Sequence, residues 1–329
     1  MTKDDIKATI FIPTWFGEQY LDEVLGAIFK QKVPYKFEVL IYDTSSTDKT
    51  PEIIAKYAKQ HDNLRHKTIS KSEFGHGKTR NVAAHDAKGE IVVYISQDVT
   101  PAHDYWLYEM VKPFELSERI VGVIGKQVPR PHSFPLLKSE IKSVFNGFGP
   151  DFGTTLFYKD EFVKDQGIYD AISFYSDVNS AARRNILVGK ISYQDVPYAE
   201  DQLLGRDFID AGYIKAYAPR GTVIHSNDMT ISEYKHRMFD ETLGLRKIGL
   251  PVEVPSRKVV AKMIVRGIVR DTLRIPRDEH YSFKRKIYWI VVNPLYHIQK
   301  WRGVRLGARV DINDSSILKK YSLEHRRSQ

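Results

Sequence analysis

The chain contains no cysteine, and this absence excludes disulfide bonds and thiolate metal sites. It also lacks a run of about 18 apolar residues, so no segment predicts a membrane-spanning helix. The N-terminus, MTKDDIKATIFIP, has no basic stretch followed by an apolar one, and we predict no signal peptide. We therefore expect a cytoplasmic protein.

The composition is that of a folded protein. Hydrophobic residues make up 42% of the 329 positions and charged residues 28%, which excludes an intrinsically disordered chain. The net charge of +9 is unevenly placed. Residues 246–329 hold 20 Lys and Arg against 7 Asp and Glu, whereas residues 1–245 hold 30 against 34. This asymmetry indicates a negatively charged partner for the last quarter of the chain.

Short apolar runs alternate with helical patterns as far as about residue 230. The runs at 8–15, 37–43 and 90–96 are typical of buried strands, and a helical pattern follows each of the first two. Such alternation predicts an α/β fold with a mainly parallel central sheet and helices on both faces. We accordingly expect a catalytic domain over residues 1–230 and a helical, basic region over residues 231–329.

Polar side chains stand where three of these strands end. Thr14, Asp43 and Asp98 each follow an apolar run, and ligands of parallel sheets bind beyond the carboxyl ends of the strands. Asp43 is either a ligand contact or a turn residue. Asp98 is either a ligand of a hard cation such as Mg²⁺ or Mn²⁺, or a turn residue before Pro101.

Three further positions allow both a chemical and an ordinary interpretation. Lys78 and Arg80 follow the glycines of FGHG at a helix start, which suits a diphosphate but also a flexible loop. Glu200 and Asp201 open an amphipathic helix, where acids are favoured in any case, and either could act as a general base. His225 is either a core histidine or a metal ligand.

The order of these motifs resembles the inverting family 2 glycosyltransferases of GT-A fold, and most closely their bacterial dTDP-rhamnosyltransferases. The resemblance covers roughly residues 8–230 and is carried by PTW, YDTSSTDKT, FGHGKTRN, SQDVTP, GKQVPRP, FYSDVNSAARR and YAEDQLLGRDFIDAGY. It implies transfer of a sugar, foremost L-rhamnose from dTDP-L-rhamnose, onto a hydroxyl of a cell-surface glycan or a lipid-linked saccharide.

The resemblance also implies roles for individual residues. The donor nucleotide would contact Pro13, Thr14, Asp43, Lys78, Arg80, Gln97 and Asp98. A divalent metal, Mg²⁺ or Mn²⁺, would be held by Asp98 and His225, although Ser96 occupies the first acidic position of the family's D-x-D element. Asp201 would be the catalytic base with Glu200 beside it, and the acceptor side would be lined by Asp177, Asn179 and Arg183.

Two alternatives stay open at this point. The same fold could use a different UDP- or dTDP-sugar, or the chain could be a non-catalytic nucleotide-sugar-binding protein or a membrane scaffold. The basic C-terminal region suits a peripheral position on an anionic membrane surface. It equally suits packing against the catalytic domain or a second subunit of a homo-oligomer. We expect no nucleic acid partner, because no recognition motif accompanies the charge.

Overall fold

A computed structural model describes residues 5–196, 198–225, 229–323 and 325. The chain divides into two compact units. Unit 1 comprises residues 1–128 and 144–225, and unit 2 comprises residues 129–143 and 226–329. The sequence-based division at residue 230 lies close to the third and last passage of the chain between the units, at residues 225 and 226. It did not include residues 129–143 in the C-terminal unit, because a Pro-rich segment predicts a bend and not the unit to which the segment belongs.

Unit 1 is built around one mixed sheet. Its strands are β1 (Ile6–Thr14), β2 (Lys36–Asp43), β3 (Leu64–Thr68), β4 (Ile91–Ile95), β5 (Thr100–Pro101), β6 (Ile120–Val128), β7 (Thr155–Phe157), β8 (Asn179–Arg183) and β9 (Ile214–Ile224). Its helices are α1 (Leu21–Ile28), α2 (Thr50–Gln60), α3 (His76–Asp86), α4 (Trp106–Val111), η1 (Lys112–Glu115), α6 (Gln166–Ser173), α7 (Arg184–Gly189) and α8 (Glu200–Asp210).

The strand order is β3-β2-β1-β4-β8-β6-β9-β5, with β7 paired to β9. Strands β1 to β4 are parallel to one another, and β6 is parallel to β9. Strand β8 is antiparallel to both of its neighbours, and β5 and β7 are antiparallel to β9. The expectation of a mainly parallel α/β sheet is therefore confirmed, with antiparallel exceptions that local sequence did not reveal.

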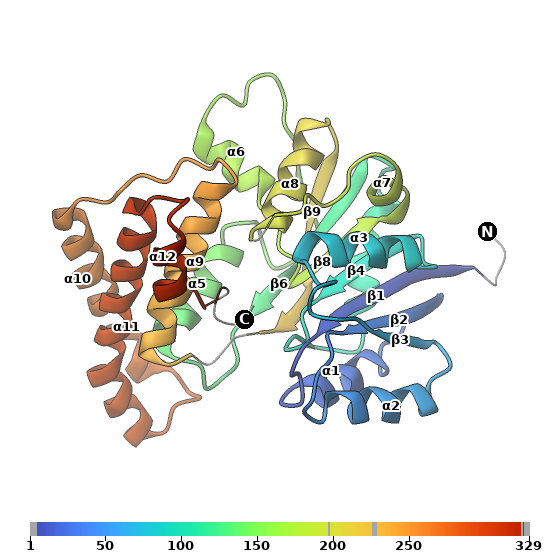
Figure 1. The fold of residues 1–329 in the computed structure, drawn as a ribbon, viewed down its shortest axis with the longest axis horizontal. Helices are drawn as coiled ribbons and strands as arrows, with labels where there is room; N and C mark the ends of the chain where they lie inside the picture. Colours follow the sequence, from blue (N-terminus) through green and yellow to red (C-terminus); the bar gives the residue numbers. More distant parts are fainter. Residues whose placement is uncertain (1–4, 197, 226–228, 324, 326–329) are drawn as a thin grey trace. The chain divides into compact units, whose positions relative to one another are not determined.

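The core of unit 1 is apolar on both faces of the sheet. The strands β1, β2 and β4 bury consecutive residues, as expected for strands covered on both sides. Helices α1 and α2 cover one face, and α3 and α7 cover the other (Figure 1). Thr14 and Asp43 are direct partners in the β1–β2 register, so the ends of these strands meet at one edge.

Unit 2 is helical, as predicted for the C-terminal region. It contains most of α5 (Pro135–Phe145) together with α9 (Ile231–Lys247), α10 (Arg257–Arg274), η2 (Ile275–Arg277), α11 (Phe283–Arg309) and α12 (Ser315–Tyr321). Its core is rich in aromatic side chains, with Phe134 stacked on Tyr296 at 4.2 Å between ring centroids. Helix α9 begins with a capping box in which Thr230 and Glu233 exchange hydrogen bonds. In the part of the chain that the structure describes, no helix combines the length and apolarity needed to cross a bilayer.

A buried carboxylate ties α5, α10 and α11 together. Asp271 accepts hydrogen bonds from Ser139 at 2.8 Å and from Asn293 at 3.1 Å. Nε2 of His297 lies 2.8 Å from Oδ2 of the same carboxylate. Arg270 adds a further charged contact at 2.8 Å. Although burial alone would raise it, the hydrogen bonds from His297, Arg270 and Ser139 lower the pKa of Asp271 to about 2.

We predict that Asp271→Ala lowers the free energy of unfolding by about 3–5 kcal/mol, because it leaves buried donors without their acceptor. Urea denaturation followed by tryptophan fluorescence measures the change. A carboxyl with a lowered pKa stabilises the fold above its unfolded pKa of 3.8 and loses that contribution as the pH falls towards 2. The difference between wild type and variant should therefore shrink from about pH 5 to about pH 2.

The matched control is Glu279→Ala, which removes an exposed acid from the same unit. An Asp271→Ala protein as stable as this control at neutral pH would contradict the assignment.

Candidate active site

The edge where β1 and β2 end carries a loop organised by Asp43. Its carboxylate accepts hydrogen bonds from the Thr14 hydroxyl at 3.0 Å, the Ser46 hydroxyl at 2.7 Å and the Ser46 amide at 2.9 Å. Asp43 is buried. The Asp43 side chain therefore forms a turn with Ser46, as the turn interpretation states. Asp43 also lies at the end of its strand beside Thr14, as the sequence predicts.

Gln97 fixes the end of β1 against the end of β4. Its Oε1 accepts from the Trp15 amide at 2.8 Å, and its Nε2 donates to the Trp15 carbonyl at 2.9 Å. A Cβ on Gly17 would stand only 2.6 Å from Oε1 of Gln97, so a side chain at position 17 would displace this clamp. The last paired residues of β1 and β4 are Phe11 and Tyr94. Beyond them, the side-chain amide of Gln97 replaces the backbone pairing by bonding the backbone of Trp15.

Asp98, in the loop after β4, and His225, directly after β9, lie next to each other. Oδ2 of Asp98 lies 3.6 Å from Nε2 of His225, and each side chain is 15% exposed. Strand β9 brings His225 there because Ile224 pairs with Thr100, two residues after Asp98. These residues are far apart in the chain, and the structure places them together as the resemblance implies.

Gln127 holds the other side of the His225 ring, and sequence reasoning missed it. Its Oε1 lies 3.2 Å from Nδ1 of His225, and its Nε2 donates to the Ser176 hydroxyl at 3.3 Å. Because a carbonyl oxygen only accepts, this contact assigns the proton to Nδ1 and leaves the Nε2 lone pair facing Asp98. The signal was present in GKQVPRP, but nothing in one sequence ties that segment to His225.

The start of α3 presents backbone amides without a side-chain cap. Gly75 precedes the helix in an extended conformation and has no side chain to cap it, while its own amide donates to the Thr79 hydroxyl at 3.1 Å. Lys78 lies in the first turn and is exposed. An uncapped helix N-terminus with an exposed lysine is a suitable environment for phosphate oxygens.

Arg80 differs from the expectation that it faces a diphosphate. Its Nε lies 2.9 Å from Asp177 and its Nη1 lies 2.8 Å from Glu200. The pKa of Arg80 is raised, because these two carboxylates outweigh the burial that disfavours its charge. The guanidinium is thus committed to holding α8 and the loop before β8 against α3.

Asp201 is the partly exposed member of a group of three acids with Asp177 and Glu200, both of which are buried. Its carboxylate accepts from the backbone amides of Asp177 at 3.1 Å and Gln202 at 2.8 Å, which fix its orientation. Ala199, immediately before the helix, has a φ of 62°, a conformation that residues other than glycine rarely adopt. Strained backbone of this kind concentrates at functional sites.

The charge of this group makes Asp201 a strong proton acceptor. Burial, followed by repulsion from Glu200 and Asp177, raises the pKa of Asp201 well above its ordinary value, although Arg80 opposes the shift. Burial likewise raises the pKa of Asp177. One guanidinium cannot neutralise three carboxylates, which is why the pKa values of Asp177 and Asp201 remain raised beside Arg80.

Asn179 and Arg183 serve the fold rather than an acceptor. Asn179 is 0% exposed and Arg183 is 5% exposed. The Asn179 amide accepts from the Trp106 indole at 3.1 Å and donates to the Gly221 carbonyl at 2.7 Å. Arg183 donates to the carbonyls of Ile120 and Phe114. The expectation that these side chains line the acceptor side does not hold, because β8 lies inside the sheet with both faces covered.

The carboxylate oxygens of Asp98 and the imidazole nitrogen of His225 suit a divalent metal that accepts both oxygen and nitrogen ligands. Among residues 5–196, 198–225, 229–323 and 325, no group of three or more His, Asp or Glu side chains is arranged to hold a metal. A metal here would therefore take two protein ligands and complete its coordination with phosphate oxygens and water, as Mg²⁺ often does.

Comparison with known proteins points to one family. The family model described as Glycosyl transferase family 2 matches residues 9–188. The chain is 30% identical over 236 residues to the O-antigen chain rhamnosyltransferase WbaN of Salmonella anatum, covering 70% of each chain. It is 30% identical over 175 residues to the poly(ribitol-phosphate) beta-N-acetylglucosaminyltransferase TarS of Staphylococcus aureus, which covers 50% of this chain but only 29% of TarS.

Solved structures agree at the level of the fold. The mannosyltransferase PcManGT from Pyrobaculum calidifontis, in complex with GDP-Man and Mn²⁺, matches 98% of this chain and 83% of its own with a TM-score of 0.50 and 17% identity. Residues 1–349 of Staphylococcus aureus TarS, in complex with UDP-GlcNAc, match 92% of this chain and 90% of their own with a TM-score of 0.50 and 18% identity. The predicted GT-A fold is confirmed.

We predict that Gln127→Leu weakens Mn²⁺ binding in the presence of a nucleoside diphosphate by about 10–100-fold, the usual cost of losing the partner of a ligating histidine. Calorimetric titration of Mn²⁺ measures the change. The matched control is Gln31→Leu, which removes another buried, bridging glutamine of unit 1 that bonds His103 and Leu107. Unchanged Mn²⁺ affinity in a folded Gln127→Leu protein would contradict the tautomer argument.

Proposed function

Because the chain belongs to glycosyltransferase family 2, we propose that it transfers L-rhamnose from dTDP-L-rhamnose, with inversion, to a hydroxyl of a saccharide. The chain is a glycosyltransferase on the strength of its family and relatives. The choice of L-rhamnose rests on the O-antigen chain rhamnosyltransferases among those relatives. Another relative, TarS, is named an N-acetylglucosaminyltransferase, so the relatives differ in the sugar that they transfer.

One observation supports the catalytic role of Asp201 above others. Asp201 is the partly exposed carboxylate of the three, and its own pKa is raised. Two backbone amides hold its carboxylate in place. A general base near neutral pH needs these three properties: reach, basicity and a fixed orientation. Glu200 contributes its negative charge to that basicity while its own carboxylate stays paired with Arg80.

The donor is proposed to lie along the strand ends. Its nucleoside would lie against the loop of Pro13, Thr14 and Asp43, which Gln97 holds closed towards β4. Its diphosphate would reach the uncapped start of α3 and the exposed Lys78. Asp98 and His225 would hold the divalent metal, which supplies positive charge against the negative charge that develops on the leaving nucleoside diphosphate.

The reaction then follows from the placement of one base. Asp201 removes the proton of an acceptor hydroxyl while the hydroxyl oxygen forms its bond to the anomeric carbon. The bond from that carbon to the diphosphate oxygen breaks on the opposite side, so the configuration inverts and the nucleoside diphosphate leaves. Asp177 orients the base through its backbone amide, and its carboxylate lies against Arg80. No covalent intermediate is required.

The acceptor is proposed to be a cell-surface glycan or a lipid-linked saccharide, with the enzyme peripheral on the inner face of the cell membrane. This proposal rests on the O-antigen and poly(ribitol-phosphate) transferases among the relatives, whose names state polymeric glycan products or acceptors. The basic region after residue 246 is compatible with such a position.

A donor screen tests the function directly. With Mn²⁺ present, we expect calorimetry to show dTDP-L-rhamnose binding at least about tenfold more tightly than UDP-GlcNAc or GDP-mannose, which corresponds to about 1.4 kcal/mol. Donor hydrolysis should follow the same order. Tighter binding and faster turnover of UDP-GlcNAc or GDP-mannose would reject L-rhamnose while leaving the transferase activity intact.

We predict that Asp201→Asn lowers kcat by about 10²–10⁴-fold, the usual contribution of a general base. Donor affinity should stay within about threefold of wild type, because this side chain makes no proposed donor contact. The control is Asp207→Asn, a neutralisation on the same helix that should leave kcat nearly unchanged. Turnover like wild type in Asp201→Asn would remove Asp201 from the role of base.

A further inference from the structure

Two neighbouring helices of unit 2 leave apolar side chains in solvent. Helices α10 and α11 pack together (Figure 1). Among the residues that the structure describes, 22 large apolar side chains are exposed, and eleven of them lie on these two helices. We use the name outer face for the following subset of their exposed apolar and basic side chains: Val259, Val265, Val269, Leu273, Phe283, Ile287, Val291, Leu295, Lys258, Lys262, Arg266, Lys284 and Arg302.

The outer face carries charge of one sign. Helix α11 has 27 residues, including seven Lys or Arg, and no Asp or Glu. The acid of α10 is Asp271, which is buried in the network that joins it to α11. An ordinary solvent-exposed helix alternates charges of both signs. The absence of acids from these faces therefore indicates a partner with negative charge.

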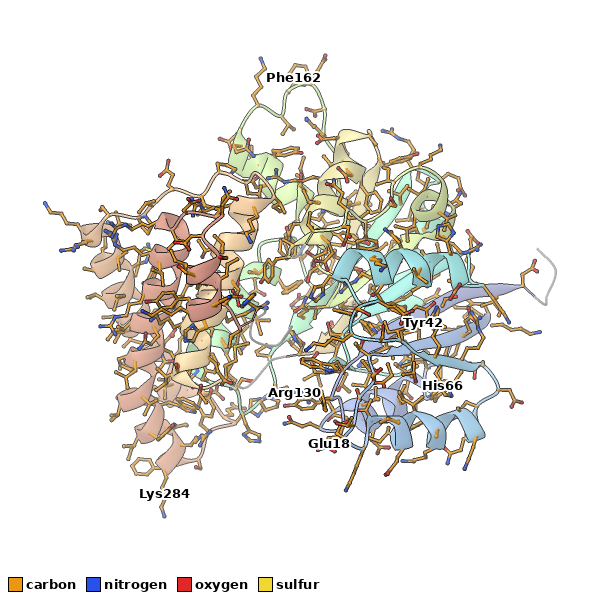
Figure 2. All side chains as sticks on the ribbon, in the orientation of Figure 1. Glu18, Tyr42, His66, Arg130, Phe162 and Lys284 are labelled. Atoms are coloured by element: carbon orange, nitrogen blue, oxygen red, sulfur yellow. The ribbon has the colours of Figure 1, made fainter. Side chains whose placement is uncertain are left out.

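Apolar and basic side chains alternate along the face instead of forming separate patches. On α10, Lys262 and Arg266 stand between Val259, Val265 and Val269 at helical spacing. On α11, Phe283, Ile287 and Val291 follow one another at intervals of four residues. Lys284 lies at the start of the same helix (Figure 2). Long cationic side chains can keep their heads in a polar layer while neighbouring apolar groups enter hydrocarbon.

A second copy of the chain is a poorer occupant of this face. A two-fold dimer would place the same surface against itself, so the cations of one protomer would meet those of the other. Phosphate headgroups instead neutralise the cations, and the boundary between headgroups and acyl chains accepts the apolar side chains. Charge and hydrophobicity are thus satisfied by the same partner.

We propose that the outer face of α10 and α11 docks on an anionic phospholipid bilayer. Phe283, Ile287 and Val291 enter the headgroup–acyl boundary, and Lys258, Lys262 and Lys284 pair with phosphate. The helices lie on the membrane and do not cross it. This docking deepens the peripheral membrane position of the proposed function by naming the surface that makes the contact. It does not depend on the sugar donor or on the proposed catalytic residues, so its failure would leave the proposed transfer reaction intact.

The test is co-sedimentation of the full chain with vesicles of phosphatidylcholine alone or with about one third phosphatidylglycerol. We expect binding to the anionic vesicles to exceed binding to the neutral ones by at least about tenfold, and to weaken with added salt. The variant Phe283→Asp with Val291→Asp should reduce binding to anionic vesicles by about tenfold or more.

Unit 1 offers matched controls. Phe162 is 78% exposed, like Phe283, and Phe152 is 77% exposed; Figure 2 labels Phe162. The double variant Phe152→Asp with Phe162→Asp should bind vesicles like wild type. For charge, Lys258→Glu with Lys262→Glu and Lys284→Glu should abolish the preference for anionic vesicles. The same number of reversals at the exposed residues Lys59, Lys88 and Lys164 should preserve it.

Three results would overturn the proposal. The first is equal binding of the wild type to neutral and anionic vesicles, and the second is an equal loss of binding in the test and control variants. The third is unchanged lipid binding of the Phe283→Asp with Val291→Asp variant, together with its change from dimer to monomer in analytical ultracentrifugation. The last result would assign the face to a second copy of the chain. Circular dichroism of each variant establishes that the helices are retained.

Discussion

The pairing of Arg80 with Asp177 and Glu200 is the interaction on which the candidate active site of unit 1 depends. Asp177 and Glu200 are buried and Asp201 is partly exposed beside them, and like charges placed so close together repel one another. Arg80 makes the arrangement tenable and joins α3 to α8 and to the loop before β8. Arg80 itself lowers the pKa of Asp201, but burial and the repulsion from Glu200 and Asp177 outweigh it, so that the pKa of Asp201 stays above its ordinary value.

From this point hydrogen bonds lead to the proposed metal ligands. Asp177 donates its amide to Asp201, and its neighbour Ser176 accepts from Gln127. Gln127 in turn fixes His225, which faces Asp98. The proposed base and the proposed metal ligands are thus joined by one connected set of residues in or next to β6, β8 and β9. Geometry at one end therefore constrains the other, as a transfer between two bound substrates requires.

The sequence predicted the positions of those candidate residues that strand topology determines. Thr14, Asp43 and Asp98 follow parallel strands, and parallel strands bring their carboxyl ends to one edge whatever the details of packing. Arg80 was misplaced, because helix position alone does not say whether a cation faces a ligand or a carboxylate from residue 200. Asn179 and Arg183 failed for a similar reason. Strand β8 is antiparallel, and only pairing partners reveal that both of its faces are covered.

Unit 2 shows why hydrophobic periodicity was a weak guide to its surface. Periodicity assumes that apolar residues face the core, yet on α10 and α11 the core face includes Asp271, Asn293 and His297. These polar groups satisfy one another, so their burial is not penalised as that of lone groups would be. The core side of the two helices is consequently filled without Val269, Leu273 and Val291. The surplus apolar side chains are left outside by the packing itself, which makes their exposure a property of the fold rather than an accident of composition.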